Sequence, residues 1–290
     1  MTGINNVLLV SMARSGGTLT NNLLDGHPAL NVFPLEFWNT CNKNQIRQPY
    51  HSLFRFLPQP IKLREVGFHQ RLQDMIEELH GQGSYHNLVT RLQADLGKIG
   101  SQSEFYDYFQ SIYFPEFFGH PCRKNSFNHV ARLCERSTDY IRQIFGPVRL
   151  AVSIRDPRAS LVSYARNLEL TRGESMTEEH VESLCALWRS VAHRFSISPE
   201  PDTLAIRYED VVLDTERTMK HLCAFIGVDF HSITLKPSRM GKPVAANSSY
   251  DNMTEMTTAP IDRWRKMIDP EIRELVEDRL KSEMEALGYT

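Results

Sequence analysis

The first candidate site is a short glycine-containing segment, SMARSGGT at residues 11–18, which follows an apolar stretch and precedes a helical pattern. The start of a helix presents amide hydrogens and the positive end of its peptide dipoles. Gly16 and Gly17 let the backbone approach an anion closely, and Arg14 adds a cation with several donors. Ser15 and Thr18 add hydroxyl groups. The segment therefore predicts a phosphate or sulfate site; the alternative is a glycine turn that only reverses the chain.

The same segment argues against two common nucleotide sites. A Walker loop needs G-x-x-x-x-G-K-[ST], and no lysine follows Gly16 and Gly17. The dinucleotide fingerprint G-x-G-x-x-G is also absent. Hydrolysis of ATP or GTP and dinucleotide binding are therefore disfavoured.

A second candidate anion site lies in RDPRASLVSY, residues 155–164, where an apolar stretch typical of a buried strand has just ended. Asp156 can cap the helix that follows, which leaves Arg155 at the strand end. Ser160 and Ser163 share one face of that helix, with Ser163 about 10 Å along its axis. An anion on that face can be bound by Ser163 and Arg155 together. The alternative is an Arg–Asp ion pair beside a capped helix.

Two separated anion sites suit a nucleotide that carries phosphates at two positions, and here the sequence resembles a known family. Residues 14–19 (RSGGTL) resemble the 5′-phosphosulfate loop of the sulfotransferases that use 3′-phosphoadenosine 5′-phosphosulfate (PAPS). Arg155, with Ser163 eight residues later, is similar to their 3′-phosphate motif. Stretches similar to further family features follow in family order: DGHP at 25–28, IRYED at 206–210 and RWR at 263–265.

The resemblance covers most of the chain except residues 40–115, and it is closer to the tyrosylprotein, carbohydrate and bacterial members than to the small phenol sulfotransferases. It implies that PAPS is the co-substrate, that the adenine lies near Tyr208, and that no metal is needed. One departure is Gly17, where the family often has the first of two threonines. The cofactor contacts implied by the resemblance are Arg14, Ser15, Gly16, Gly17, Thr18, Leu19, Arg155, Ser163, Tyr208, Arg263 and Arg265.

Sulfuryl transfer needs an acceptor oxygen in line with the leaving phosphate, stabilisation of charge, and a base for the acceptor proton. Arg14 is the cation predicted to act at the phosphate–sulfate bridge. Lys124, in RKNSF at residues 123–127, is similar to a family lysine that contacts the sulfuryl group. The alternative for Lys124 is a solvated basic pair with Arg123.

The predicted general base is Glu36, in VFPLEFW at residues 32–38. Apolar and aromatic neighbours can raise the pKa of a carboxyl group towards the working range. Its place eight residues after Pro28 resembles that of the catalytic glutamate in carbohydrate members. The alternative is a surface glutamate at a strand end. His27 is more typical of a residue that closes a turn.

The elements that must position these residues alternate between strand and helix. Apolar stretches at 7–10, 148–154 and 203–206 predict buried strands, and the helical patterns after them predict βα units. We therefore expect an α/β, P-loop-like three-layer fold with a central parallel sheet and helices on both faces, in one domain over residues 1–290. A mostly helical insertion at about 40–125 would cover the acceptor side; most of its aromatic residues at 105–118 are expected to be core.

Composition sets limits on function. The chain has 290 residues with 33 basic and 35 acidic side chains, a balance without the basic character of a nucleic-acid binder. Five cysteines without a CxxC pair and eleven histidines without metal-ligand spacing predict no metal site and reduced thiols. Without a signal peptide or an apolar membrane segment, we expect a cytoplasmic enzyme with a small-molecule or carbohydrate acceptor. A nucleotide-dependent kinase and a non-catalytic nucleotide-binding protein remain the alternatives.

Overall fold

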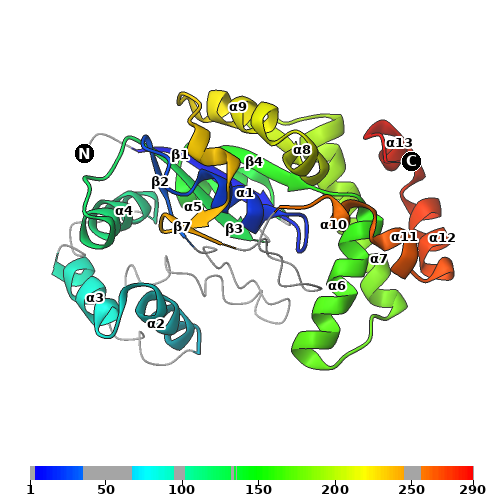
Figure 1. Ribbon diagram of the computed structural model, residues 1–290, viewed down its shortest axis with the longest axis horizontal. Helices are drawn as coiled ribbons and strands as arrows, with labels where there is room; N and C mark the ends of the chain where they lie inside the picture. Colours follow the sequence, from blue (N-terminus) through cyan, green and yellow to red (C-terminus); the bar gives the residue numbers. More distant parts are fainter. Residues whose placement is uncertain are drawn as a thin grey trace.

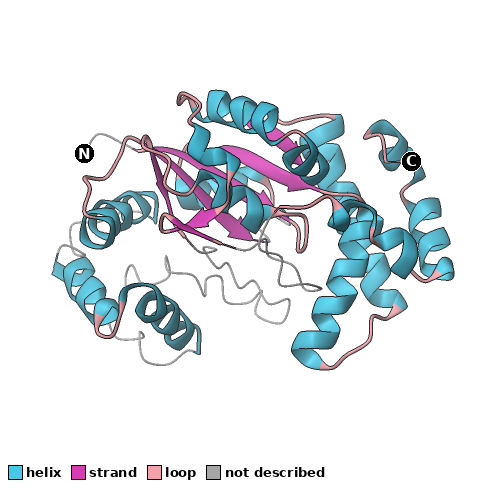
Figure 2. Ribbon diagram, viewed as in Figure 1, coloured by secondary structure: helices cyan, strands magenta, loops and turns pink. Residues whose placement is uncertain are grey.

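The computed structural model of the chain describes residues 4–34, 67–94, 102–131, 134, 136–244 and 256–289. At its centre lies a parallel sheet of five strands in the order β2-β3-β1-β4-β5 (Figures 1 and 2). The strands are β1 Asn5–Ser11, β2 Leu30–Val32, β3 Asn125–Ala131, β4 Arg149–Ile154 and β5 Thr203–Arg207. The predicted α/β class and parallel sheet are confirmed.

Helices follow the strands and cover both faces of the sheet (Figure 2). The helices that follow β1, β4 and β5 are α1 Gly17–Leu24, α6 Pro157–Arg172, α7 Glu178–Ala192, α8 Tyr208–Leu213 and α9 Thr215–Ile226. The helices between β2 and β4 are α2 Gly67–His80, α3 Ser84–Ala94, α4 Gln102–Phe118 and α5 Thr138–Phe145. The last helices are α10 Ala259–Asp262, α11 Trp264–Met267, α12 Pro270–Arg279 and α13 Lys281–Ala286.

Four shorter elements complete the fold. A π-helical turn, His193–Ile197, extends α7, and a 3₁₀ turn occupies Ser232–Leu235. The strands β6 Ser238–Arg239 and β7 Lys242–Pro243 form a small antiparallel hairpin.

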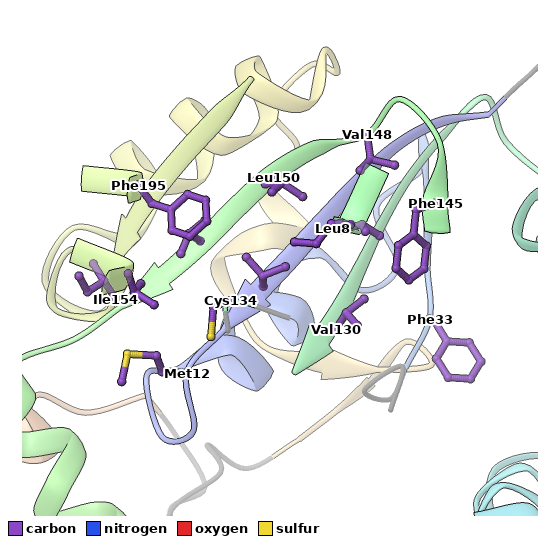
Figure 3. Packing of buried hydrophobic residues seen from close by; sticks show 14 of the residues in the cluster. Leu8, Met12, Phe33, Val130, Cys134, Phe145, Val148, Leu150, Ile154 and Phe195 are labelled. Carbon is purple, nitrogen blue, oxygen red and sulfur yellow. The ribbon is translucent and has the colours of Figure 1, made fainter. Parts of the chain in front are cut away.

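Alternate residues of the strands point into two hydrophobic clusters, one on each face. Val7 and Leu9 of β1 pack with residues of α1 and α9. Leu8 and Val10 face the other way, into a cluster that includes residues of β4, the aromatic residues of α4, and residues of α7. Figure 3 shows part of this cluster, including Leu8, Val130 of β3 and Leu150 of β4. Because β1 and β4 are buried on both faces, their central residues, 7–10 and 150–152, are consecutive apolar residues, which is why their positions were predictable.

Side chains cap several of the helix starts, among them Asp156, the cap predicted from sequence. The side chains of Asp156, Thr177, Asp214 and Asp269 accept hydrogen bonds from the first turns of α6, α7, α9 and α12. The helix that starts after Asp269, α12, breaks at Leu280, and the chain continues as α13.

The described part of the insertion is helical, as predicted. Its α4 carries the aromatic residues of segment 105–118 whose side chains are buried, namely Tyr106, Tyr108, Phe109, Tyr113 and Phe114. They pack against residues of the sheet, so the interpretation of most of this segment as core is confirmed. Within the residues described, every helix is too short or too polar to cross a lipid bilayer.

Candidate functional site

The two predicted anion segments meet at one edge of the sheet because their strands are neighbours. β1 and β4 run parallel, with Ser11 beside Ser153. The glycine loop leaves β1 after Ser11, and Arg155 directly follows β4. Loops at the carboxyl ends of parallel strands are the usual ligand sites of such sheets.

The glycine loop is held in a tight, ordered turn before α1. Arg14 and Gly16 both adopt the left-handed conformation, with φ of 68° and 93°. The Ser15 hydroxyl donates to the Met12 carbonyl at 2.9 Å, and the Ser153 hydroxyl donates to the Ser15 carbonyl. The Ser15 amide also donates to the Met12 carbonyl, at 3.4 Å, so both Ser15 donors are bonded within the loop. Among the described residues, no side chain caps the start of α1.

Both glycines are required by close packing. A Cβ at Gly16 would overlap Cδ2 of Tyr208 and lie 3.3 Å from its Cγ. A Cβ at Gly17 would lie 2.6 Å from the Ser11 hydroxyl and overlap the His129 ring. Ser11 Oγ and His129 Nε2 are hydrogen-bonded at 2.6 Å and almost fully buried. The departure from the family at Gly17 thus has a local cause: this pair occupies the space of a threonine side chain.

Arg155 lies between the loop, Tyr208 and the C-terminal segment. Its guanidinium donates to the Arg14 carbonyl at 3.2 Å and to the Pro260 carbonyl. Its Cζ lies 4.3 Å from the centroid of the Tyr208 ring, within the range of a cation–π contact. Burial lowers the pKa of Arg155, an effect that the nearby Tyr208 and Glu209 oppose. A buried cation bonded to neutral carbonyl groups is suited to an anionic partner.

The alternative of an Arg–Asp ion pair at this turn is realised by a different arginine. Arg158 donates to both oxygens of Asp156, with an N···O distance of 2.8 Å in the ion pair, and also pairs with Glu277 at 2.7 Å. Its guanidinium packs on the ring of Trp264 at 4.1 Å. Arg158 therefore anchors the start of α6 to α11 and α12, and Asp156 does not take Arg155 away from the loop.

Arg14 connects the two anion segments. Its Nε donates to the Ser163 hydroxyl at 2.9 Å, so the sequence positions 14, 155 and 163 converge as predicted. Two donors beside them fit an anion: Arg155 Nε and Ser160 Oγ are buried and make no hydrogen bond within the described residues. A buried polar atom without a partner is costly, which is why such atoms mark ligand sites.

The remaining predicted cofactor residues divide into two groups. Burial raises the pKa of Tyr208, while the positive charges of Arg155, Arg263 and Arg14 oppose that shift, so Arg263 lies near the cluster. Leu19 is buried in the core and can contribute its backbone to the site. Arg265 has different neighbours: it pairs with Asp262 at 3.2 Å and lies 4.7 Å from the Trp264 ring.

The structure contradicts the prediction for Lys124. This residue directly precedes β3, whose first residue, Asn125, pairs with Asn5 at the start of β1. The glycine loop follows the other end of β1, about 20 Å away at 3.3 Å per residue. Lys124 is exposed at the opposite edge of the sheet and cannot contact a group held by the loop. The predicted base, Glu36, lies outside the described residues.

Sequence reasoning missed residues that support the site from below. His129 was hidden because β3 is mostly polar and was not recognised as a strand. Ser11 directly follows the predicted strand at 7–10. The pairing of β1 with β3 brings its hydroxyl to His129, beneath the glycine loop. Among the described side chains, no group of His, Cys, Asp or Glu is arranged to hold a metal ion.

The DGHP stretch at 25–28 has a structural role in the described chain. Asp25 is buried and accepts hydrogen bonds from the Ser238 hydroxyl at 2.6 Å and the Gly241 amide at 2.8 Å. It thereby fixes the β6–β7 hairpin against the end of α1. His27 Nε2 lies 3.0 Å from the Asp229 carbonyl oxygen, which supports its interpretation as a turn residue.

Comparison with known proteins bears on the fold and the family. No curated protein sequence matches the chain. Among solved structures, the sulfotransferase domain from the Synechococcus PCC 7002 olefin synthase has a TM-score of 0.63 and 18% identity, over 96% of this chain and 95% of that one. The sulfotransferase domain from the curacin biosynthetic pathway has a TM-score of 0.58 and 20% identity, over 97% and 98%. Similarity at this level of identity establishes the fold.

The assignment to a family rests on the sequence itself. Residues 6–232 match the sulfotransferase family, a span that contains β1 to β5, the glycine loop, Arg155 and Ser163. The chain belongs to the sulfotransferase family.

Proposed function

We propose that the protein transfers a sulfuryl group from PAPS to a hydroxyl or amine of a small-molecule or carbohydrate acceptor. The observation that carries the proposal is the convergence of Arg14, Arg155 and Ser163 at the carboxyl ends of β1 and β4. The glycine loop and the Arg155/Ser163 pair give this edge two anion sites. PAPS carries anionic groups at its 5′ and 3′ positions, and it fits this arrangement.

In this proposal the glycine loop binds the 5′-phosphosulfate. The amides at the start of α1 and the Arg14 guanidinium stabilise the phosphate as it leaves. The 3′-phosphate accepts hydrogen bonds from Ser163, Ser160 and Arg155. Two of these donors, Arg155 Nε and the Ser160 hydroxyl, have no partner among the described residues. Tyr208 packs beside Gly16 and Arg155, close to where the adenosine would lie.

The reaction forms one bond to sulfur and breaks another. The acceptor oxygen attacks the sulfur in line with the bridging oxygen of the donor, and the S–O bond to the 5′-phosphate breaks. Adenosine 3′,5′-bisphosphate leaves with the bonding electrons, and its charge is stabilised by Arg14 and the loop amides. The acceptor proton passes to a general base, a contribution of about 10²- to 10⁴-fold.

Glu36 is the proposed base. The strand β2 that precedes it runs parallel to β1, so the chain leaves β2 towards the edge that carries the glycine loop. Phe33, the first residue after β2, is buried among aromatic rings of α4.

The proposed compartment is the cytoplasm. The four described cysteines, Cys122, Cys134, Cys185 and Cys223, are all free thiols. Three of them are buried, and reduced buried thiols are usual in reducing compartments.

The donor is tested by ligand-dependent thermal stability. A ligand at a hundredfold excess over its Kd stabilises the protein by about 2.7 kcal/mol. We expect adenosine 3′,5′-bisphosphate to raise the melting temperature of the wild type and not of Arg155→Ala. The control is Arg166→Ala, which removes an arginine of α6, the helix that follows Arg155; Arg166 pairs with Glu169 there. This variant should keep the shift. Stabilisation by ATP with magnesium alone would indicate the kinase alternative.

Catalysis is tested with labelled donor over sugars, phenols, lipids and peptides. Glu36→Gln should keep the bisphosphate shift and lose transfer, because it removes the base and leaves the nucleotide site unchanged. Normal turnover by this variant would assign the base elsewhere. Bisphosphate binding without transfer to any acceptor class would favour the non-catalytic alternative.

A further inference from the structure

The peptide group that joins Arg155 to Asp156 has both of its polar atoms bonded to buried side chains. The Arg155 carbonyl accepts from Trp188 Nε1 at 2.9 Å. The Asp156 amide donates to Glu209 Oε1 at 3.0 Å. Trp188 comes from α7 and Glu209 from α8, so two helices fix the orientation of the peptide that carries the Arg155 side chain.

Both of these side chains contact one further residue, Tyr289. The Tyr289 hydroxyl donates to Glu209 Oε2 at 3.1 Å. The Tyr289 and Trp188 rings meet edge to face, with centroids 6.0 Å apart. Tyr289 is 5% exposed, Glu209 is 7% exposed and Trp188 is 2% exposed, so the whole group is shielded from water.

Tyr289 is held in this place by the segment that precedes it. Its amide donates to the Met284 carbonyl at 2.8 Å, directly after α13. Glu283 of α13 pairs with Arg189 and His193 of the α7 region at 3.0 and 3.1 Å. α12 and α13 therefore lie against α7, at the same end of the molecule as α6 (Figure 1).

The charge balance of this group makes the Tyr289 hydroxyl more than a packing contact. Burial raises the pKa of Glu209, and hydrogen bonds to its carboxylate from backbone amides, including that of Asp156, oppose the shift. A carboxylate in this environment needs donors, because a charge without hydrogen bonds is costly to bury. The Tyr289 hydroxyl supplies one donor to Oε2 and so orients the carboxylate whose other oxygen, Oε1, accepts from the Asp156 amide.

We infer that Tyr289, with Trp188 and Glu209, is a positioning residue for the 3′-phosphate site: the three side chains fix the Arg155–Asp156 peptide and thereby pre-orient the Arg155 guanidinium. This inference rests on the proposed function, in which Arg155 binds the 3′-phosphate. Pre-orientation raises affinity because less freedom is lost when the ligand binds. Its effect is confined to ligands that carry a 3′-phosphate.

The test compares two nucleotides on each variant. Adenosine 3′,5′-bisphosphate and adenosine 5′-phosphate differ only in the 3′-phosphate. The Kd of the monophosphate divided by the Kd of the bisphosphate therefore measures the contribution of that phosphate. In Tyr289→Phe and in Trp188→Phe we expect this ratio to fall by about threefold or more. The first variant loses the hydrogen bond to Glu209, and the second loses the hydrogen bond to the Arg155 carbonyl. Affinity for adenosine 5′-phosphate should change little. The KM for PAPS should rise while kcat stays close to that of the wild type.

The matched control is Tyr108→Phe. Tyr108, in α4, is 7% exposed, and its hydroxyl donates to the carbonyl of Arg91 in α3 at 3.0 Å. The control loses a buried hydroxyl of the same kind and should keep the wild-type ratio. A general loss of stability alone would affect all three variants without changing the ratio.

The outcomes separate this inference from the proposed function. If the wild type binds the bisphosphate more tightly than the monophosphate and the ratio is unchanged in Tyr289→Phe and Trp188→Phe, the inference is wrong and the proposed function stands. If the wild type does not prefer the bisphosphate, the proposed function fails and the inference fails with it. A ratio that falls in both variants and not in Tyr108→Phe supports the inference.

Discussion

Replacement of Gly16 by alanine tests the geometry of the glycine loop directly. Gly16 has a φ of 93°, and a side chain in the left-handed region costs about 1–2 kcal/mol. The new Cβ would also overlap Cδ2 of Tyr208 and lie 3.3 Å from Cγ and Cε2, so the ring must shift. Overpacking of this kind costs about 1–3 kcal/mol. The expected total loss is about 2–5 kcal/mol.

Gly173→Ala is the matched control. Gly173 ends α6 with a φ of 66°, and a Cβ there would meet nothing within 4 Å. This variant suffers the backbone strain alone, about 1–2 kcal/mol. At about 2 °C per kcal/mol for a chain of this size, the melting temperature should fall by about 4–10 °C for Gly16→Ala and about 2–4 °C for Gly173→Ala.

A second background identifies the cause. In Tyr208→Ala the ring is gone, so Gly16→Ala should cost only what Gly173→Ala costs. The assay is chemical denaturation of the four single and double variants, with bisphosphate binding measured in parallel. Two results would refute the reasoning. One is an equal loss of unfolding free energy for Gly16→Ala and Gly173→Ala in the wild-type background. The other is a larger loss for Gly16→Ala than for Gly173→Ala that remains in the Tyr208→Ala background.

Three further predictions follow from individual side chains. Because burial raises the pKa of Glu209 in the folded state, the wild type should lose stability relative to Glu209→Gln as the pH rises above 4.5, measured by urea denaturation across pH. Burial lowers the pKa of His80 from 6.5 to about 4. The free energy of unfolding should therefore decrease as the pH falls from 6.5 to about 4, and His80→Gln should not show this decrease. Lys124→Ala should keep kcat within about twofold and change the free energy of unfolding by less than about 0.5 kcal/mol, since Lys124 is exposed and at the far edge of the sheet; a large fall in kcat would return it to the site.

The strands buried on both faces could be predicted from sequence, and β3 could not. β1 and β4 are apolar runs, whereas β3 reads NSFNHVA and carries four polar residues. Those polar residues are buried through side-chain partners: Asn128 accepts from the Phe33 amide at 2.8 Å, and His129 bonds Ser11. Such pairings join residues about a hundred positions apart, and local periodicity contains no trace of them.

The error at Lys124 has the same origin. The short match around residues 123–127 gave a residue type and a place in the family order, but no strand register. Once Asn125 pairs with Asn5, the lysine before it must lie at the amino end of the sheet. By contrast, Arg14 and Arg155 were placed correctly because each directly follows an apolar strand whose carboxyl end is recognisable from sequence.

The contacts behind Arg155 lay beyond prediction for a related reason. Trp188 and Tyr289 each have the pattern of an ordinary core aromatic on a helix or after one. Trp188 bonds the Arg155–Asp156 peptide directly, and Tyr289 does so through Glu209. Both contacts depend on how α7 and α13 pack together, and the residue spacing within either helix does not predict that packing.

The position of β1 in the sheet also bears on how the protein is made. β1 lies between β3 and β4, and its partners are far along the chain: Asn5 pairs with Asn125, and Val7 with Arg149. A nascent chain that has emerged only as far as α4 has a central strand with both hydrogen-bonding edges open. Closing such distant pairs is slow, because the entropy of a long loop is lost before contacts compensate for it. Hydrogen exchange at the amides of residues 7–10 should therefore report complete unfolding, and the proposed nucleotide site should be among the last parts of the molecule to acquire its shape during synthesis.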